Sequence, residues 1–163
     1  MTQSRVDVTQ PSSSELSLSR VFAAPSGLVF DAWTQPELLR RWYGPAGWQL
    51  VVCEIDLRVG GAWRFVSRQP GGREIGQHGV FRELSPGRRI VQTESWEDWN
   101  PGEVIVTTTF EEQAGGTRVT TSMRFPSAEV RDMLIKSGMA DGYGEAADKL
   151  DALLSEQVEQ ADR

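Results

Sequence analysis

Polar and apolar residues alternate along much of the chain, which is the pattern of strands that bury one face. The alternation begins at Glu15 with Leu16 and Leu18 and recurs in six later runs separated by Gly- and Pro-rich turns. These runs lie at 48–57, 61–68, 74–84, 89–96, 103–112 and 117–125. Because such short turns join antiparallel neighbours, we expect a seven-stranded antiparallel sheet.

Three segments show apolar residues at helical spacing instead. Two short helices are predicted directly after the first strand, at about 25–33 and 36–42. A long helix is predicted from Ser127, a favourable N-cap, to about Gln157, with a break near Ser137-Gly138 because glycine is a poor helix former. Its apolar stripe would pack on the sheet and consists of Tyr143, Ala146, Ala147, Leu150, Leu153 and Leu154. The predicted class is α+β, in the order β-αα-ββββββ-α.

The length of 163 residues leaves room for one domain, which we place at residues 15–157. Residues 1–14 are rich in Ser, Thr and Gln, and a segment of this composition is predicted to be a disordered tail. Residues 158–163 are expected to fray at the end of the long helix.

Charge and composition exclude several classes of function. Seventeen Lys and Arg against 23 Asp and Glu give a net charge of -6, which disfavours binding to nucleic acids or anionic membranes. With one cysteine, Cys53, and one histidine, His78, the chain lacks the ligands of zinc sites, and we expect no metal and no cofactor. No export signal and no long apolar run is present, so a cytoplasmic location is expected.

The element order coincides with five sequence strings: RVFAAPSGLVFDAWTQPELLRRWYGP (20–45), CEIDLRVGGAWRF (53–65), GVFRELSPGRRIVQT (79–93), VTTTFEEQAGGTRVTTSMRFPS (106–127) and GMADGYGEAADKLDALL (138–154). In this order they resemble the START/birch-pollen-allergen (SRPBCC) superfamily of helix-grip folds. Within it the chain is most similar to small stand-alone bacterial members of the branch named for the activator of the heat-shock protein 90 ATPase. Gly142-Tyr143 departs from the Gly-Trp of many relatives.

The resemblance implies a hydrophobic cavity between the long helix and the concave sheet, which would bind a small, largely apolar molecule. Fold alone does not settle function, so two alternatives stay open. One is an enzyme of polyketide cyclase-like type acting on an aromatic substrate. The other is a chaperone-activator-like module that binds another protein. A homodimer is also expected, because the first strand, 15–23, carries few charges to protect a free sheet edge.

The long helix itself also points to a cavity, since Gly138, Gly142 and Ala146 leave one of its faces nearly bare. The alternative is that these small residues allow a close approach of the sheet. The expected ligand-binding residues are mostly aromatic or Met: Trp42, Tyr43, Trp48, Trp63, Phe65, Phe81, Trp96, Met123, Phe125, Met133, Met139, Gly142 and Tyr143. Each of these side chains would serve equally well as core filling.

Candidates for acid-base catalysis within the sheet are few. They are His78, Glu54 and Asp56, with Glu74 and Glu94 as further carboxyl groups of the predicted strands. A catalytic triad is recognised by geometry, and spacing alone supports none here. We expect structural roles for these residues, and we expect His78 to be dispensable because the glycines around it give it little support.

Overall fold

The computed structural model describes residues 6–162, which form four helices and eight strands. The strands are β1 (Asp7–Thr9), β2 (Glu15–Phe22), β3 (Gln49–Ile55), β4 (Ala62–Arg68), β5 (Glu74–Ser85), β6 (Arg89–Trp96), β7 (Val104–Gln113) and β8 (Gly116–Arg124). The helices are α1 (Ser26–Thr34), α2 (Pro36–Trp42), α3 (Ala128–Lys136) and α4 (Met139–Ala161). The predicted α+β class and element order are confirmed.

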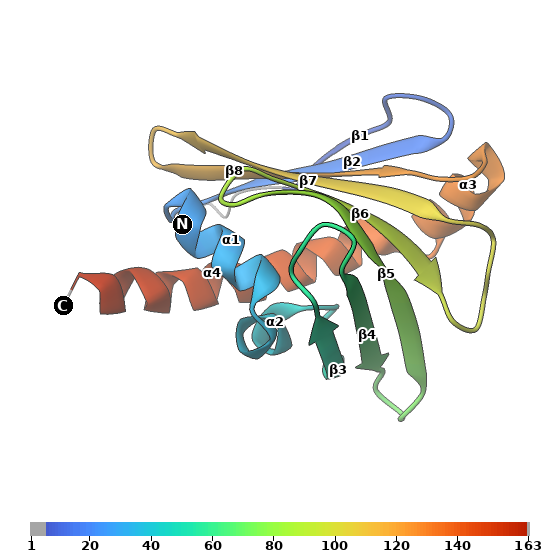
Figure 1. The fold of residues 1–163 in the computed structure, drawn as a ribbon, viewed down its shortest axis with the longest axis horizontal. Coiled ribbons are helices and arrows are strands. Elements are labelled where there is room, and N and C mark those ends of the chain that lie inside the picture. Colours follow the sequence, from blue (N-terminus) through green and yellow to red (C-terminus); the bar gives the residue numbers. More distant parts are fainter. Residues whose placement is uncertain (1–5, 163) are drawn as a thin grey trace.

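All strands belong to one antiparallel sheet in the order β1-β2-β8-β7-β6-β5-β4-β3. In Figure 1 the sheet bends sharply between the layer of β1, β2, β8 and β7 and the layer of β5, β4 and β3, and α4 runs along its inner side. Helices α1 and α2 contact α4, and they also reach β7 and β3, respectively. The sheet therefore wraps around α4, as expected for a helix-grip fold.

The number of strands corrects the prediction of seven. The additional strand, β1, lies within residues 1–14, and Asp7–Thr9 pairs with Ser17–Ser19 of β2. All three residues of β1 are exposed, so hydrophobic patterning gives no signal for a strand that main-chain pairing holds in place. Residues 1–5 of the predicted tail lie outside the described residues. Because β1 covers part of β2, the free sheet edge used to predict a homodimer is not free over Ser17–Ser19.

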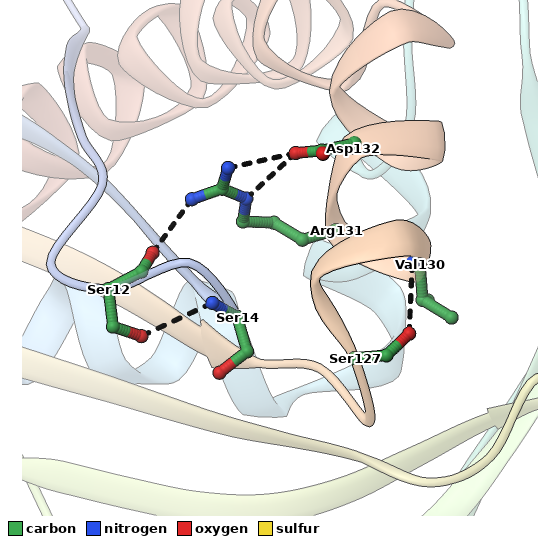
Figure 2. Close-up of polar contacts among 6 residues, drawn as sticks. All are labelled: Ser12, Ser14, Ser127, Val130, Arg131 and Asp132. Carbon is green, nitrogen blue, oxygen red and sulfur yellow. Dashed lines mark hydrogen bonds and ion pairs between the residues drawn. The ribbon is translucent and has the colours of Figure 1, made fainter.

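The chain before β2 is also tied to helix α3, as Figure 2 shows. Arg131 donates a hydrogen bond from Nη1 to the main-chain oxygen of Ser12 at 2.7 Å and forms an ion pair with Asp132. The predicted N-cap is present, because the Ser127 hydroxyl accepts a hydrogen bond from the Val130 amide at 3.2 Å. At the other end of the chain, α4 continues beyond Gln157 to Ala161.

The long helical segment is interrupted near Ser137-Gly138, as the sequence predicts. Gly138 adopts a left-handed backbone (φ 88°) between α3 and α4, a conformation that costs glycine little. Buried Arg20 of β2 then holds α4 to the sheet through a 2.7 Å ion pair with Asp148. The middle of α4 buries Ala146, Ala147 and Leu150, with two further leucines.

The core consists of two clusters. The larger one joins α1, α2 and the middle of α4 to β3, β4, β5 and one residue each of the other long strands, with Trp63 among its largest buried side chains. The smaller one joins β2, β7 and β8 to α3 through residues such as Leu18, Val106 and Met123. Tyr143 of α4 packs against both clusters, so it lies where they meet.

Gly79 in β5 allows the indole ring of Trp63 to pack across the strand. Trp63 of β4 pairs with Gly79 of β5, and the Trp63 indole N–H donates a 3.1 Å hydrogen bond to the main-chain oxygen of Thr93 in β6. The indole therefore crosses β5 at Gly79. A Cβ atom at position 79 would lie 1.9 Å from the Thr93 oxygen and 2.8 Å from Trp63 Nε1. No residue with a side chain fits at this point of the strand.

We predict that Gly79→Ala lowers the free energy of unfolding by about 2–4 kcal/mol, because either the strand or Trp63 must move. Gly27→Ala is the matched control, since a Cβ atom there meets nothing within 4 Å in helix α1. It is expected to leave stability unchanged or to raise it by up to about 1 kcal/mol. Chemical denaturation of both variants is the measurement. Equal effects of the two substitutions would contradict this account of Gly79.

Candidate functional site

A cavity of about 390 Å³ lies between the two core clusters. Its wall includes Leu18, Val106 and Met123 from the smaller cluster, and it includes Trp63 and Ala146 from the larger one. Ser137 and Gly138 at the junction of α3 and α4 are both exposed and part of the wall, so the cavity extends to the surface there. Its volume lies within the usual range for small-ligand sites of about 300–1,000 Å³.

Most residues expected to bind a ligand lie in this wall. They are Trp42, Tyr43, Trp48, Trp63, Phe65, Phe81, Trp96, Met123, Met139, Gly142 and Tyr143. The other two lie elsewhere: Phe125 is buried in the smaller cluster, and Met133 on α3 is 54% exposed. A role in ligand binding stays a prediction for the residues in the wall.

The position of Gly142 corrects one part of the argument for a bare helix face. A Cβ atom at Gly142 would approach the Pro45 side chain to 3.1 Å, so this glycine makes room for the loop before β3. The same loop is bound to α4 by hydrogen bonds from Lys149 to the Pro45 oxygen and from the Ala46 amide to Glu145, both at 3.2 Å. Close approach to the loop therefore explains Gly142, although this glycine also lines the cavity, as Ala146 does.

Polar side chains in the wall gather around one carboxyl group. Glu94 on β6 is half-buried, has Gln92 and Trp96 on the same strand face, and lines the cavity with both of them. Burial raises the pKa of the Glu94 carboxyl to about 7. The pairs His78–Ser95 and Phe81–Gln92 place Gly79 opposite Glu94, so the neighbouring strand has no side chain at that level.

Two tyrosines add hydroxyl groups to the wall. Tyr43 donates a hydrogen bond to Gln77 Oε1 at 3.2 Å, and burial together with the charge of Glu94 raises the pKa of its phenol. Burial also raises the pKa of Tyr143, against smaller opposing effects of the Thr121 hydroxyl and of Arg20. The hydroxyls of Tyr143 and Thr121 have no partner at hydrogen-bond geometry within the described chain. The hydroxyl groups of Tyr143 and Thr121 are therefore available to hydrogen-bond to a ligand in the cavity.

Of the five candidates for acid-base catalysis, Glu94 lies in this wall and the other four lie outside it. Glu74 is exposed and pairs with Arg68. His78 is 51% exposed and lies 3.6 Å from the carboxylate of Glu97, while Glu54 and Asp56 are exposed and pair with arginines. Alternation along β6 is the signal that distinguishes Glu94 from them, because it places this carboxyl group on the face of Trp96. Which face of the strand points inward is decided by the fold.

The geometry offers no site for a metal ion: within residues 6–162, no three His, Cys, Asp or Glu side chains are grouped to hold one. In the same range, no helix is long and apolar enough to cross a membrane. Cys53 is buried, and burial raises the pKa of its thiol to about 11, which keeps it protonated and unreactive at neutral pH.

Replacing the carboxyl group of Glu94 should change how stability depends on pH. The pKa of about 7 in the folded chain lies above the ordinary value of 4.5, so the wild type loses stability as pH rises from about 4.5 to 7. We predict that Glu94→Gln raises the free energy of unfolding by about 1–3 kcal/mol at pH 8 and by much less at pH 5. Thermal unfolding at both pH values measures this difference.

The control is Glu111→Gln, which removes the same charge from an exposed position on the neighbouring strand β7. Its effect should be within about 0.5 kcal/mol of zero at either pH. A stability gain for Glu94→Gln that is the same at pH 5 and pH 8 would show that the carboxyl group is not held in its uncharged form by burial.

Known proteins of the same fold are numerous among bacteria. A structure from Rhodobacter sphaeroides is 30% identical over 93% of this chain and 98% of its own, with a TM-score of 0.86. Structures of proteins from Nitrosomonas europaea and Mycobacterium smegmatis are each 27% identical over 91% of this chain, covering 98% and 96% of their own chains, with TM-scores of 0.83 and 0.81. No curated protein matches the sequence.

Residues 23–155 match the family described as activator of Hsp90 ATPase homolog 1-like protein. The match begins just after β2 and ends within α4, so it includes the aromatic wall of the cavity and Glu94. This agrees with the resemblance of the five sequence strings. The chain therefore belongs to the family of activator of Hsp90 ATPase homolog 1-like proteins.

Proposed function

We propose that this protein binds a small, largely apolar molecule in the cavity between α4 and the sheet. The family fold supports a ligand-binding or an activator-like module, and the cavity is the observation that favours ligand binding. Its wall is mostly apolar and combines nine aromatic side chains with a few hydroxyl, amide and carboxyl groups. Burying apolar ligand surface there would supply about 25 cal/mol per Å², and the few polar groups would orient the ligand.

Glu94 is the observation that favours catalysis as a second candidate function. A carboxyl group with a pKa of about 7 is suited to proton transfer at neutral pH. An enzyme acting on an aromatic, polyketide-like substrate would use this group as its acid or base. Mass spectrometry of the protein purified from its own host, under native conditions, separates the two functions, because a binding protein retains its ligand unchanged.

A homodimer and a cytoplasmic location also stay predictions. The edges of the sheet are β1 and β3, and β1 is only three residues long. Strand β3 is therefore the longer edge at which two copies could pair their main chains.

Filling the cavity should abolish binding without loss of stability. Thr121 lines the cavity and buries a hydroxyl that has no hydrogen-bond partner within the described chain. We predict that Thr121→Phe lowers the affinity for 1-N-phenylnaphthylamine, an uncharged apolar fluorophore, by about tenfold or more. Thermal stability should be equal to that of the wild type or higher, because an unsatisfied hydroxyl is removed and apolar volume is added.

Thr120→Phe is the matched control, since strand alternation points residue 120 to the opposite face of β8. It should bind the fluorophore as the wild type does. If the wild type failed to bind the fluorophore, or if both variants bound it equally well, the cavity would not be the binding site and the proposed function would be wrong.

A further inference from the structure

Among the described residues, the wall of the cavity has an acidic side chain but no basic one. Glu94 is its one carboxyl group among the described residues, and no Lys, Arg or His of that part of the chain belongs to the wall. Several charged groups elsewhere in the sheet are paired with each other on the outside, as Arg64 is with Glu97 at 2.8 Å. Glu94 itself has no hydrogen bond or ion pair to another side chain in the described chain. A half-buried carboxyl group that lines a largely apolar cavity without a side-chain partner can pair with a charged group of the ligand.

The rest of the wall fits a cation. It contains the rings of five Trp, two Tyr and two Phe residues. Some of these rings are packed edge to face or tilted against each other, including Tyr43 on Phe65 at 5.1 Å and Trp63 on Phe65 at 4.9 Å. Faces of aromatic rings carry partial negative charge and attract ammonium groups, most strongly where water is excluded. An anionic ligand, by contrast, would find uncharged donors in the wall but no positively charged side chain, and it would meet the charge of Glu94.

We propose that the ligand of this cavity is a lipophilic amine, an aliphatic or aryl-alkyl chain whose ammonium group pairs with the Glu94 carboxylate among the aromatic rings. The inference rests on the proposed function, since it specifies the class of molecule that the cavity binds. The apolar body of the ligand would lie along Leu18, Val106 and Met123 of the other wall. Oxygens of Tyr43, Gln77 and Gln92 would accept the remaining ammonium hydrogens.

The titratable groups around Glu94 leave it free to respond to such a ligand. Tyr43 faces it from the end of α2 and is uncharged at neutral pH, and so are Cys53 of β3 and Tyr143 of α4. On β5, His78 is exposed and pairs with Glu97. Arg64 on β4 is exposed and pairs with Glu97, and Glu103, just before β7, is exposed and pairs with Arg82. The raised pKa of Glu94 has burial as its cause, so an ammonium group beside it would lower that pKa again.

Three probes with one carbon skeleton test the inference by isothermal titration calorimetry: 4-phenylbutylamine, 4-phenylbutan-1-ol and 4-phenylbutanoic acid. At pH 8 the wild type should bind the amine about tenfold or more tightly than the alcohol, and the acid most weakly. Between pH 6 and pH 8 the affinity for the amine should rise about tenfold as Glu94 ionises, with no such change for the alcohol. The amine itself stays protonated over this range.

Glu94→Gln should remove both the preference for the amine and its pH dependence, while the affinity for the alcohol changes less than about threefold. Glu111→Gln, exposed on β7, should behave as the wild type does. If the alcohol binds and displaces 1-N-phenylnaphthylamine but the amine is not preferred, or the acid is preferred, the amine inference is wrong and the proposed function stands. If none of the three probes binds and the fluorophore does not bind either, both are wrong.

Discussion

The packing of α4 against the concave face of the sheet is the contact on which the rest of the structure depends. It is closest along the middle of the helix, where Ala146, Ala147 and three leucines are buried and Arg20 pairs with Asp148. In its first two turns the helix instead contacts the loop around Pro45, through Gly142 and Glu145. The cavity lies beneath this N-terminal part of the helix, where Met139, Gly142 and Tyr143 line it.

Two glycines shape the wall of that space. Gly79 lets the Trp63 indole cross β5 opposite Glu94 and bind the main chain of β6. Gly142 lets the Pro45 loop approach the helix closely. The two core clusters are each closely packed, and the cavity separates them. A protein interior normally leaves few voids, so a cavity of about 390 Å³ is a distinct feature of this core.

One acidic group of the cavity, the Glu94 carboxyl group, has no side chain of opposite charge beside it. Arg20 is buried, but it has Asp148 as a partner, and several arginines and glutamates of the outer face pair with each other. Glu94 lines the cavity without a side-chain partner, and burial raises the pKa of its carboxyl group to about 7. The catalytic function and the inferred preference for a cation depend on this carboxyl group, whereas binding of an uncharged apolar molecule does not.

The sequence by itself determined the element order, the antiparallel sheet, the helix break at Gly138 and the family, because alternation, turn residues and glycine act locally and leave a readable pattern. It missed β1, whose exposed residues are held by main-chain pairing with β2 and by an ion pair between Asp7 and Arg118. Only the tertiary structure decided that Glu94, and not His78, faces the cavity. Alternation puts Gln92, Glu94 and Trp96 on one face, but whether that face is inside depends on bulges and on what packs across the sheet. The role of Gly142 could not be predicted from the sequence for the same reason. A helix face without side chains fits either a void or a close contact, and only the fold shows that the loop around Pro45 packs there.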